Sequence, residues 1–225
     1  MDKEFAMLEG LLGNRSESNM RGRRFVAGAV GENEVVAMKC GIGKVNSAVG
    51  AVEMIDAFAP DLVVSTGVAG GAWTGLEVRD VVVGAECCYH DVYCGSECKL
   101  GQVLGMPERY AAPARVVERA MSACGGAKLH KGLIVSGDWF VDSREKMRSI
   151  LDGFPDALAV DMESCSIAQV CHLRNVPFVS FRIISDIPLK DNKAQMYYDF
   201  WDKMAEGSFH VAKSFLSGID SSVLD

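Results

Sequence analysis

Hydrophobic and polar positions alternate in blocks along most of the chain, and each block has the length of one strand or one helix. Short apolar runs rich in β-branched residues predict strands at residues 61–71, 78–85, 132–137 and 178–184. Apolar residues at helical spacing predict helices at residues 1–12, 114–124, 162–174 and 197–216, and another that follows Gly43 and ends before Pro60. This order of elements predicts an α/β fold with a largely parallel sheet.

The first forty residues depart from this alternation. Residues 14–24 are polar and contain four arginines, which is typical of a solvated loop. Residues 25–39 hold two β-like runs separated by Gly31, Glu32 and Asn33, and this pattern predicts a hairpin. We expect the hairpin to make the sheet mixed.

The stretch 160–188, around which the rest of the chain is organised, begins with an acidic cluster, Asp161 to Glu163. Glu163 lies at the start of a predicted helix, and Asp186 lies at the end of the next predicted strand. Because ligands of open α/β sheets bind beyond the carboxyl ends of the strands, these two carboxylates are expected to share a pocket and to carry acid/base chemistry. The alternative is that Glu163 only favours the helix start and that Asp186 belongs to an ordinary turn.

Arg182 favours the functional interpretation of this stretch. It is a cation within an otherwise apolar strand, four residues before Asp186. A buried guanidinium needs a carboxylate partner, and we expect that partner to be Glu163.

Other segments offer candidate binding features. Gly41 and Gly43 precede a helix, so they either cradle a phosphate or form a tight turn; the spacing is not that of a P-loop. The bulky residues 139–141 follow a strand end and are either plain core or the apolar floor for a flat ring. The cysteines and histidine within residues 87–98 have a spacing that fits a zinc site poorly, and we expect no metal.

Composition excludes several classes of protein. The chain has 225 residues, 49% of them hydrophobic, which favours one domain with a sizeable core. A net charge of −7 argues against nucleic-acid binding and favours a small neutral or cationic ligand. The apolar setting of three of the eight cysteines, the absence of a secretory signal and the lack of a long apolar run predict a soluble protein of the reducing cytoplasm.

Five motifs in order, GIGKVNSA, STGVAGG, IVSGDWFVD, AVDMES and ISD, resemble the nucleosidases that cleave 5′-methylthioadenosine and S-adenosylhomocysteine, within the purine nucleoside and uridine phosphorylase superfamily. The similarity extends over nearly the whole chain. It implies a single nucleosidase domain over residues 1–225 with a three-layer α/β/α fold and a mixed, partly barrel-like, phosphorylase/hydrolase-like sheet. It also implies hydrolysis of the bond between adenine and ribose, no metal or organic cofactor, a small-molecule nucleoside as substrate, no nucleic-acid or membrane partner, and a homodimer.

The resemblance also implies a role for each matching residue. Asp186 corresponds to the acid at nitrogen 7 of the purine, held by Ser185. Glu163 corresponds to the carboxylate on the ribose hydroxyls, with Met162 beneath the sugar. Glu4 corresponds to the carboxylate that orients the attacking water, and Arg182 lies near that water. Phe140 and Val141 correspond to the adenine slot, and Ile42, Ala69 and Gly70 to positions near the sugar and base. Tyr198 or its neighbour Tyr197 corresponds to the residue that closes over the ligand.

Two positions depart from the family pattern. The family has a short strand ahead of the segment that matches Met1 to Glu4, so we expect the first strand to be missing before Met1. Val68 stands where the family commonly has a serine near the water. Two alternatives to a nucleosidase therefore stay open: a phosphorylase of the same superfamily, and a binding protein for adenosine thioethers that does not catalyse.

Overall fold

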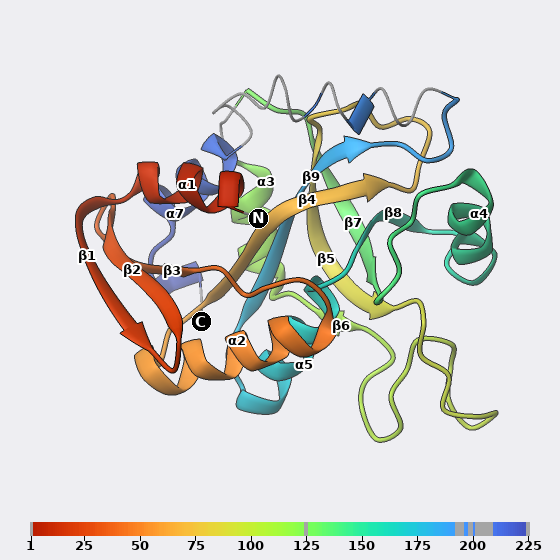
Figure 1. Ribbon diagram of the computed structural model, residues 1–225, viewed down its shortest axis with the longest axis horizontal. Helices are drawn as coiled ribbons and strands as arrows, with labels where there is room; N and C mark the ends of the chain where they lie inside the picture. Colours follow the sequence, from red (N-terminus) through yellow and green to blue (C-terminus); the bar gives the residue numbers. More distant parts are fainter. Residues whose placement is uncertain (1, 124–125, 192–195, 198–199, 201–208, 224–225) are drawn as a thin grey trace.

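The computed structural model describes residues 2–123, 126–191, 196–197, 200 and 209–223. It contains two sheets and the helices that pack on them (Figure 1). The first sheet comprises β1 (Gly13–Met20), β2 (Arg23–Val30) and β3 (Asn33–Met38). The second comprises β4 (Val63–Gly71), β5 (Val81–Tyr89), β6 (Tyr110–Ala111), β7 (Leu129–Ser136), β8 (Ala157–Asp161) and β9 (Phe178–Asp186). The helices are α1 (Asp2–Leu11), α2 (Lys44–Phe58), α3 (Ala114–Met121), α4 (Arg144–Gly153), α5 (Ser164–Arg174) and α7 (His210–Gly218), with a 3₁₀ turn η2 (Ser221–Val223).

The larger sheet closes on itself. Its strand order is β6-β5-β7-β8-β4-β9, and β5 also pairs with β9, so five strands form a ring with β6 on its outside. The pairs β4–β9, β5–β7 and β7–β8 are parallel, whereas β4–β8, β5–β6 and β5–β9 are antiparallel. The predicted α/β fold with a mixed, partly barrel-like sheet is confirmed.

Two predictions for the first forty residues are wrong. The segment predicted as a solvated loop forms the exposed strand β1, because pairing with β2 uses backbone groups and needs no apolar side chain. An ion pair from Arg24 to Glu17 adds a link between these two strands. The predicted hairpin of β2 and β3 is present, but it belongs to the separate three-stranded sheet and is not what makes the larger sheet mixed.

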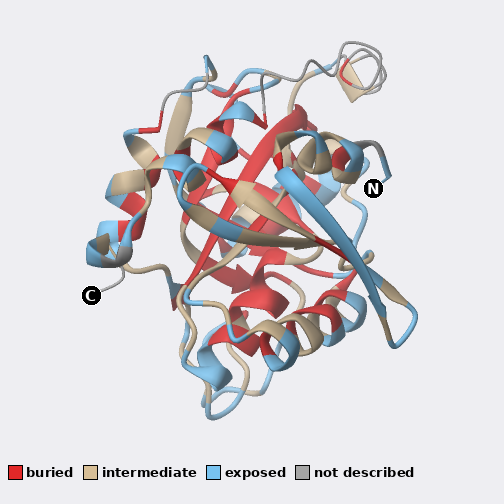
Figure 2. Cartoon of the chain, turned by 90° about the vertical axis from the view of Figure 1, so that its left-hand side faces the viewer, coloured by how far each residue is buried: buried red, intermediate tan, exposed pale blue. Residues whose placement is uncertain are grey.

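The elements around residues 160–188 are confirmed. The helix α5 ends at Asn175, which adopts a left-handed conformation with φ of 53°, and the chain then enters β9. Every residue of β9 is buried, including Arg182 and Asp186. Figure 2 shows the buried strands running through the centre of the molecule, with exposed residues on β1 and on the outer faces of the helices.

The helices cover the ring of strands from several sides. Ala51 and Ile55 of α2 share a buried cluster with Ile167 of α5, while Val116 of α3 and Phe215 of α7 belong to another. The predicted helix over residues 114–124 is confirmed to Met121, and the one over residues 1–12 corresponds to α1. Half of the helix predicted over residues 197–216 lies outside the described residues, and its final part corresponds to α7. Within the described part of the chain, no helix has the length and hydropathy that a membrane span requires.

Candidate active site

A cavity of about 910 Å³ opens where β4, β8 and β9 end and where α1 and the turn before α2 approach them. Eleven of the twelve residues that the sequence singles out line it: Glu4, Ile42, Ala69, Gly70, Phe140, Val141, Met162, Glu163, Arg182, Ser185 and Asp186. The twelfth, Tyr198, lies outside the described residues, although its neighbour Tyr197 lines the cavity. The cavity therefore collects side chains from nearly the whole length of the chain.

The end of β9 carries Asp186 into this cavity through an irregularity in the ladder. Ala69 of β4 pairs with Ile184, but the next residue, Gly70, pairs with Asp186, so Ser185 is an extra residue in β9. Such a bulge re-aims the side chains that follow it. The hydroxyl of Ser185 lies 2.7 Å from Oδ1 of Asp186, so the bulge residue orients the carboxyl group.

Glu163 occupies the N-cap position of α5 but does not cap that helix with its side chain. Its Oε1 accepts a hydrogen bond of 3.0 Å from the backbone N–H of Gly43, across the cavity. Burial raises the pKa of the Glu163 carboxyl, and the negative charge of Asp161 raises it further, while Arg182 opposes the rise. A carboxylate of this kind is poised to interact with a group that carries positive charge or donates hydrogen bonds.

Arg182 does not pair with Glu163, and that prediction is wrong. Its Nε bonds the carboxylate of Asp161 and lies 3.0 Å from the hydroxyl of Ser164, while its Nη2 donates to the hydroxyl of Ser65 at 2.9 Å. Asp161 is the last residue of β8 and points inward, whereas Glu163 has already turned toward the start of α2. Asp161, and not Glu163, is therefore the carboxylate that pairs with the buried guanidinium of Arg182.

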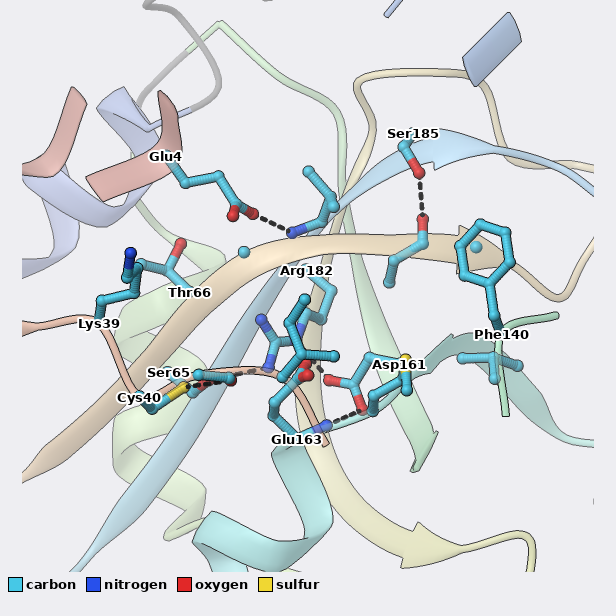
Figure 3. Close-up of a pocket in the computed structure, with 18 of the residues that line it drawn as sticks. Glu4, Lys39, Cys40, Ser65, Thr66, Phe140, Asp161, Glu163, Arg182 and Ser185 are labelled. Carbon is cyan, nitrogen blue, oxygen red and sulfur yellow. Dashed lines mark hydrogen bonds and ion pairs between the residues drawn. The ribbon is translucent and has the colours of Figure 1, made fainter. Parts of the chain in front are cut away.

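Glu4 reaches the cavity from α1 and is 8% exposed. Its Oε1 accepts a 3.0 Å hydrogen bond from the backbone N–H of Val68 on β4 (Figure 3). Because the donor is a main-chain group, the valine side chain at this position leaves the contact intact. In the close-up, Glu4 and Phe140 lie at opposite ends of the cavity, with Arg182, Asp161 and Glu163 between them.

In the segment after β7, Trp139 and Phe140 form an exposed apolar wall, while Val141 packs partly buried against the core. The side chain of Phe140 is 61% exposed, and Trp139 is 47% exposed. The ring of Phe140 meets the ring of Tyr197 edge to face, with centroids 6.4 Å apart. Exposed aromatic rings beside a cavity favour the second interpretation of these residues, a floor for a flat ring.

The glycine turn before α2 presents its amide groups to carboxylates of the protein. The N–H of Gly43 donates to Glu163, and the N–H of Lys44 donates to Oδ1 of Asp138 at 2.8 Å. The Lys44 side chain forms an ion pair with Asp91, whose Oδ2 also accepts the N–H of Asp138. This arrangement favours the tight-turn interpretation over a phosphate cradle.

The cysteines between residues 87 and 98 lie in different environments. Cys87 and Cys88 are buried in β5, while Cys94 is exposed in the following loop. Burial raises the pKa of Cys88 to about 11, so this thiol is protonated at neutral pH. Among the described residues, no three or more His, Cys, Asp or Glu side chains are grouped so that they can hold a metal ion.

Sequence reasoning missed the roles of Asp161 and Gly67. Asp161 stands two residues before Glu163 in the same acidic cluster, and its place at the end of a strand was the available signal. Gly67 pairs with Arg182 across the parallel ladder, and a Cβ there would lie 2.4 Å from Nη1 of Arg182 and 3.3 Å from Oε1 of Glu4. The glycine thus leaves the space in which the arginine side chain lies across β4.

The family model of the phosphorylase superfamily matches residues 1–217. A 5′-methylthioadenosine/S-adenosylhomocysteine nucleosidase of Anoxybacillus flavithermus is 39% identical over 224 residues, which are 98% of this chain and 96% of that protein. The structure of the corresponding nucleosidase of S. pneumoniae with the transition-state inhibitor MT-ImmA superposes with a TM-score of 0.90 at 32% identity, covering 98% of this chain and 96% of that one. The structure of futalosine hydrolase of Helicobacter pylori superposes with a TM-score of 0.87 at 29% identity, covering 97% of this chain and 95% of that one.

The close approach of the Arg182 guanidinium to Gly67 predicts that a side chain at this position destabilises the protein. Gly67→Ala should destabilise the protein by about 1–3 kcal/mol, since the added methyl group displaces a guanidinium that is held by buried partners. As a matched control, Gly10→Ala in α1 meets no atom within 4 Å and should leave stability unchanged or raise it by up to about 1 kcal/mol. Urea unfolding measures the free energy of unfolding of both variants. An equal change in the two variants would contradict the proposed clash between a side chain at residue 67 and Arg182.

Proposed function

The chain belongs to the 5′-methylthioadenosine/S-adenosylhomocysteine nucleosidases, N-glycosyl hydrolases of the phosphorylase superfamily, and we propose from this that it hydrolyses the bond between adenine and ribose in those two nucleosides. The products are adenine and a thioribose. The observation that carries the proposal is the presence of three carboxylates, Glu4, Glu163 and Asp186, around one cavity with an aromatic wall.

The proposed general acid is Asp186. Adenine is a poor leaving group as an anion, so a proton must reach nitrogen 7 of the purine as the bond breaks. General acid catalysis of this kind contributes about 10² to 10⁴ in rate. The hydroxyl of Ser185, at 2.7 Å from Oδ1, holds the carboxyl group in one orientation, which supports its use as a positioned acid.

The proposed role of Glu163 is to stabilise the sugar. As the glycosidic bond breaks, the ribose becomes positively charged, and an ionised carboxylate on its hydroxyls lowers the energy of that state. Met162, which lines the same cavity, is proposed to lie beneath the sugar ring. The hydrogen bond from the N–H of Gly43 holds the Glu163 carboxylate in place before substrate arrives.

The proposed water site lies between Glu4 and Arg182. Glu4 takes the proton of the attacking water, and Arg182, whose side chain lies beside Glu4 over Gly67, helps to hold the water. The contact from the N–H of Val68 fixes the Glu4 carboxylate without a serine at that position. This supports catalysis over a role limited to ligand binding.

The remaining cavity residues are proposed to recognise the substrate. Phe140 and Val141 form the slot for adenine, where main-chain groups read the base. Ile42, Ala69 and Gly70 lie near the sugar and the base. Tyr197, which contacts Phe140, or the adjacent Tyr198 closes over the ligand. The chemistry proposed for these residues requires neither a metal nor an organic cofactor.

The charges of the cavity favour hydrolysis over phosphorolysis. A phosphate co-substrate requires several cationic groups, and among the described residues that line the cavity these are Lys39 and Arg182. Lys39 pairs with Asp2, and Arg182 pairs with Asp161. The nearby Arg23 and Arg24 pair with glutamates, so the described residues provide no cluster of available cations for an anion site.

A homodimer is also proposed. Ile42, Val45 and Val49 follow one another at helical spacing and are 61%, 74% and 43% exposed, so the start of α2 presents an apolar face to solvent beside the cavity. A second copy of the chain that packs on this face would cover both the apolar side chains and the thioether end of the substrate. A cytoplasmic location stays a prediction.

The first test is release of adenine from methylthioadenosine, with and without phosphate. Turnover is expected to be equal in both, because water is the proposed nucleophile. S-Adenosylhomocysteine and futalosine are compared as substrates, since one structural neighbour is a futalosine hydrolase. A dependence of the rate on phosphate would show a phosphorylase, and tight binding without turnover would show a binding protein.

A second test addresses the proposed acid. Asp186→Asn should lower kcat by at least about a hundredfold while ligand binding is largely kept, because protonation matters most in the transition state. The control is Asp191→Asn, which removes an aspartate whose side chain is 95% exposed and should not change kcat. Full activity of the first variant would remove Asp186 from the mechanism.

A third test addresses the dimer. Sedimentation of the wild-type chain at micromolar concentration is expected to show a dimer, and Val45→Glu should shift it toward monomer because the charge would be buried in the interface. Arg148→Glu, on the exposed side of α4 away from α2 (Figure 1), places an acid elsewhere and should leave the dimer intact. A wild-type protein that sediments only as monomer would contradict the proposal.

A further inference from the structure

Asp161 lines the cavity and accepts several hydrogen bonds at once, although it has no part in the proposed chemistry. Its side chain is 1% exposed. Its oxygens accept hydrogen bonds from the hydroxyls of Ser136 and Ser164 and from the Nε of Arg182. They also accept the backbone N–H groups of Glu163 and Ser164, at 3.3 and 3.2 Å. Five donors thus converge on one buried carboxylate.

These contacts connect two groups on different elements. Arg182 comes from β9, and its side chain crosses β4 over Gly67 to reach Asp161 at the end of β8. Glu163 begins α5, and the backbone N–H groups of residues 163 and 164 are both tied to Asp161. Figure 3 shows Asp161 beside both Arg182 and Glu163, with a hydrogen bond to each. The same carboxylate therefore sets the position of the guanidinium and the direction in which α5 starts.

We propose that Asp161 is the positioning residue of this site, which holds Arg182 toward the water and Glu163 toward the ribose in a single fixed arrangement. The inference rests on the proposed function, because it assumes that both groups act on the substrate. Asp161 itself touches neither the substrate nor the water in this proposal. It acts through Arg182 and through the first turn of α5.

The physical basis is the cost of an unpaired buried charge. Arg182 is 3% exposed, and loss of its carboxylate partner leaves the guanidinium with the neutral hydroxyls of Ser65 and Ser164 as its hydrogen-bond partners among the described side chains. Such a cation moves toward another anion of the cavity wall, such as Glu4, whose Oε1 lies with Nη1 of Arg182 over Gly67, or Glu163, whose charge already acts on Arg182. Either movement takes the arginine away from the place where the water is proposed to lie.

The charge of Asp161 also affects the titration of Glu163. The charged or titratable groups that act on Glu163 are Asp161 on β8, Arg182 on β9 and Cys40 before α2. The negative charge of Asp161 disfavours the ionised form of Glu163 and so raises its pKa. Removal of this charge lowers that pKa, so ionised Glu163 should persist to lower pH.

The test is the variant Asp161→Asn, which keeps the size of the side chain and removes its charge. Its kcat on methylthioadenosine should fall by about a hundredfold with a smaller change in KM, as expected when a catalytic group is misplaced by about 1 Å. The acid limb of its pH–rate profile should move to lower pH. The control is Asp80→Asn, another buried aspartate, paired with His130 outside the cavity, which should leave this limb in place.

A double-mutant cycle identifies the group through which Asp161 acts. In the background of Arg182→Met, the additional change Asp161→Asn should lower kcat by much less than it does in the wild type, because the partner is already absent. The double variant also removes both buried charges, so it should fold even if the single variant Asp161→Asn does not. Independent, additive losses in the two backgrounds would overturn the proposal.

A readout that does not depend on turnover separates this inference from the proposed function. Carbon NMR of labelled glutamate carboxyls measures the pKa of Glu163 in the free protein, and Asp161→Asn should lower it. If the wild type fails to release adenine but this pKa falls, the proposed function is wrong and the arrangement of the groups is right. If adenine is released but the pKa and the acid limb stay in place, the positioning role is wrong.

Discussion

The buried ion pair between Asp161 and Arg182 is the interaction on which the cavity depends. A guanidinium that is 3% exposed can be kept in the centre of a sheet only if a carboxylate meets it, and that carboxylate lies two strands away at the end of β8. The intervening strand β4 therefore carries Gly67, where no side chain separates the pair. Hydroxyls of Ser65, Ser136 and Ser164 surround the two charged groups and form hydrogen bonds with them.

Around this pair, three carboxylates are delivered by three different kinds of local structure. Asp186 is aimed by a bulge at the end of β9, Glu163 by the N-cap position of α5, and Glu4 by a helix whose carboxylate reaches the main chain of β4. Their environments differ accordingly, since Glu163 is desolvated and lies near another negative charge, whereas Asp186 has the hydroxyl of Ser185 beside it. Unlike environments let chemically similar groups take unlike roles, which is what the proposed hydrolysis requires.

The candidate site was predicted more fully than the network that supports it. Glu163 and Asp186 stand at the junction of a helix start and a strand end, where the pattern of the chain predicts a ligand site, and the family resemblance added Glu4 from the far end of the sequence. The partner of Arg182 was predicted wrongly, because Asp161 and Glu163 are only two residues apart and the sequence does not tell which of the two points inward. The exposed strand β1 was missed for a related reason: its pairing is made by the backbone, and its polar side chains carry no strand pattern.

By itself, the sequence determined many of the strands and helices, although not β1, β6, β8 or α4, together with the α/β class of the fold and the places of Glu163 and Asp186 at a helix start and a strand end. These features depend on hydrophobic periodicity and on turn residues such as Gly43 and Asn175, which act over a few neighbouring positions. Tertiary structure alone decided that β5 meets β9 to close the ring, that the hairpin forms a sheet of its own, and that Arg182 crosses Gly67 to reach Asp161. The physical reason is that these contacts join segments far apart in the chain, and which partner satisfies a buried charge or a free strand edge depends on how all the elements pack together.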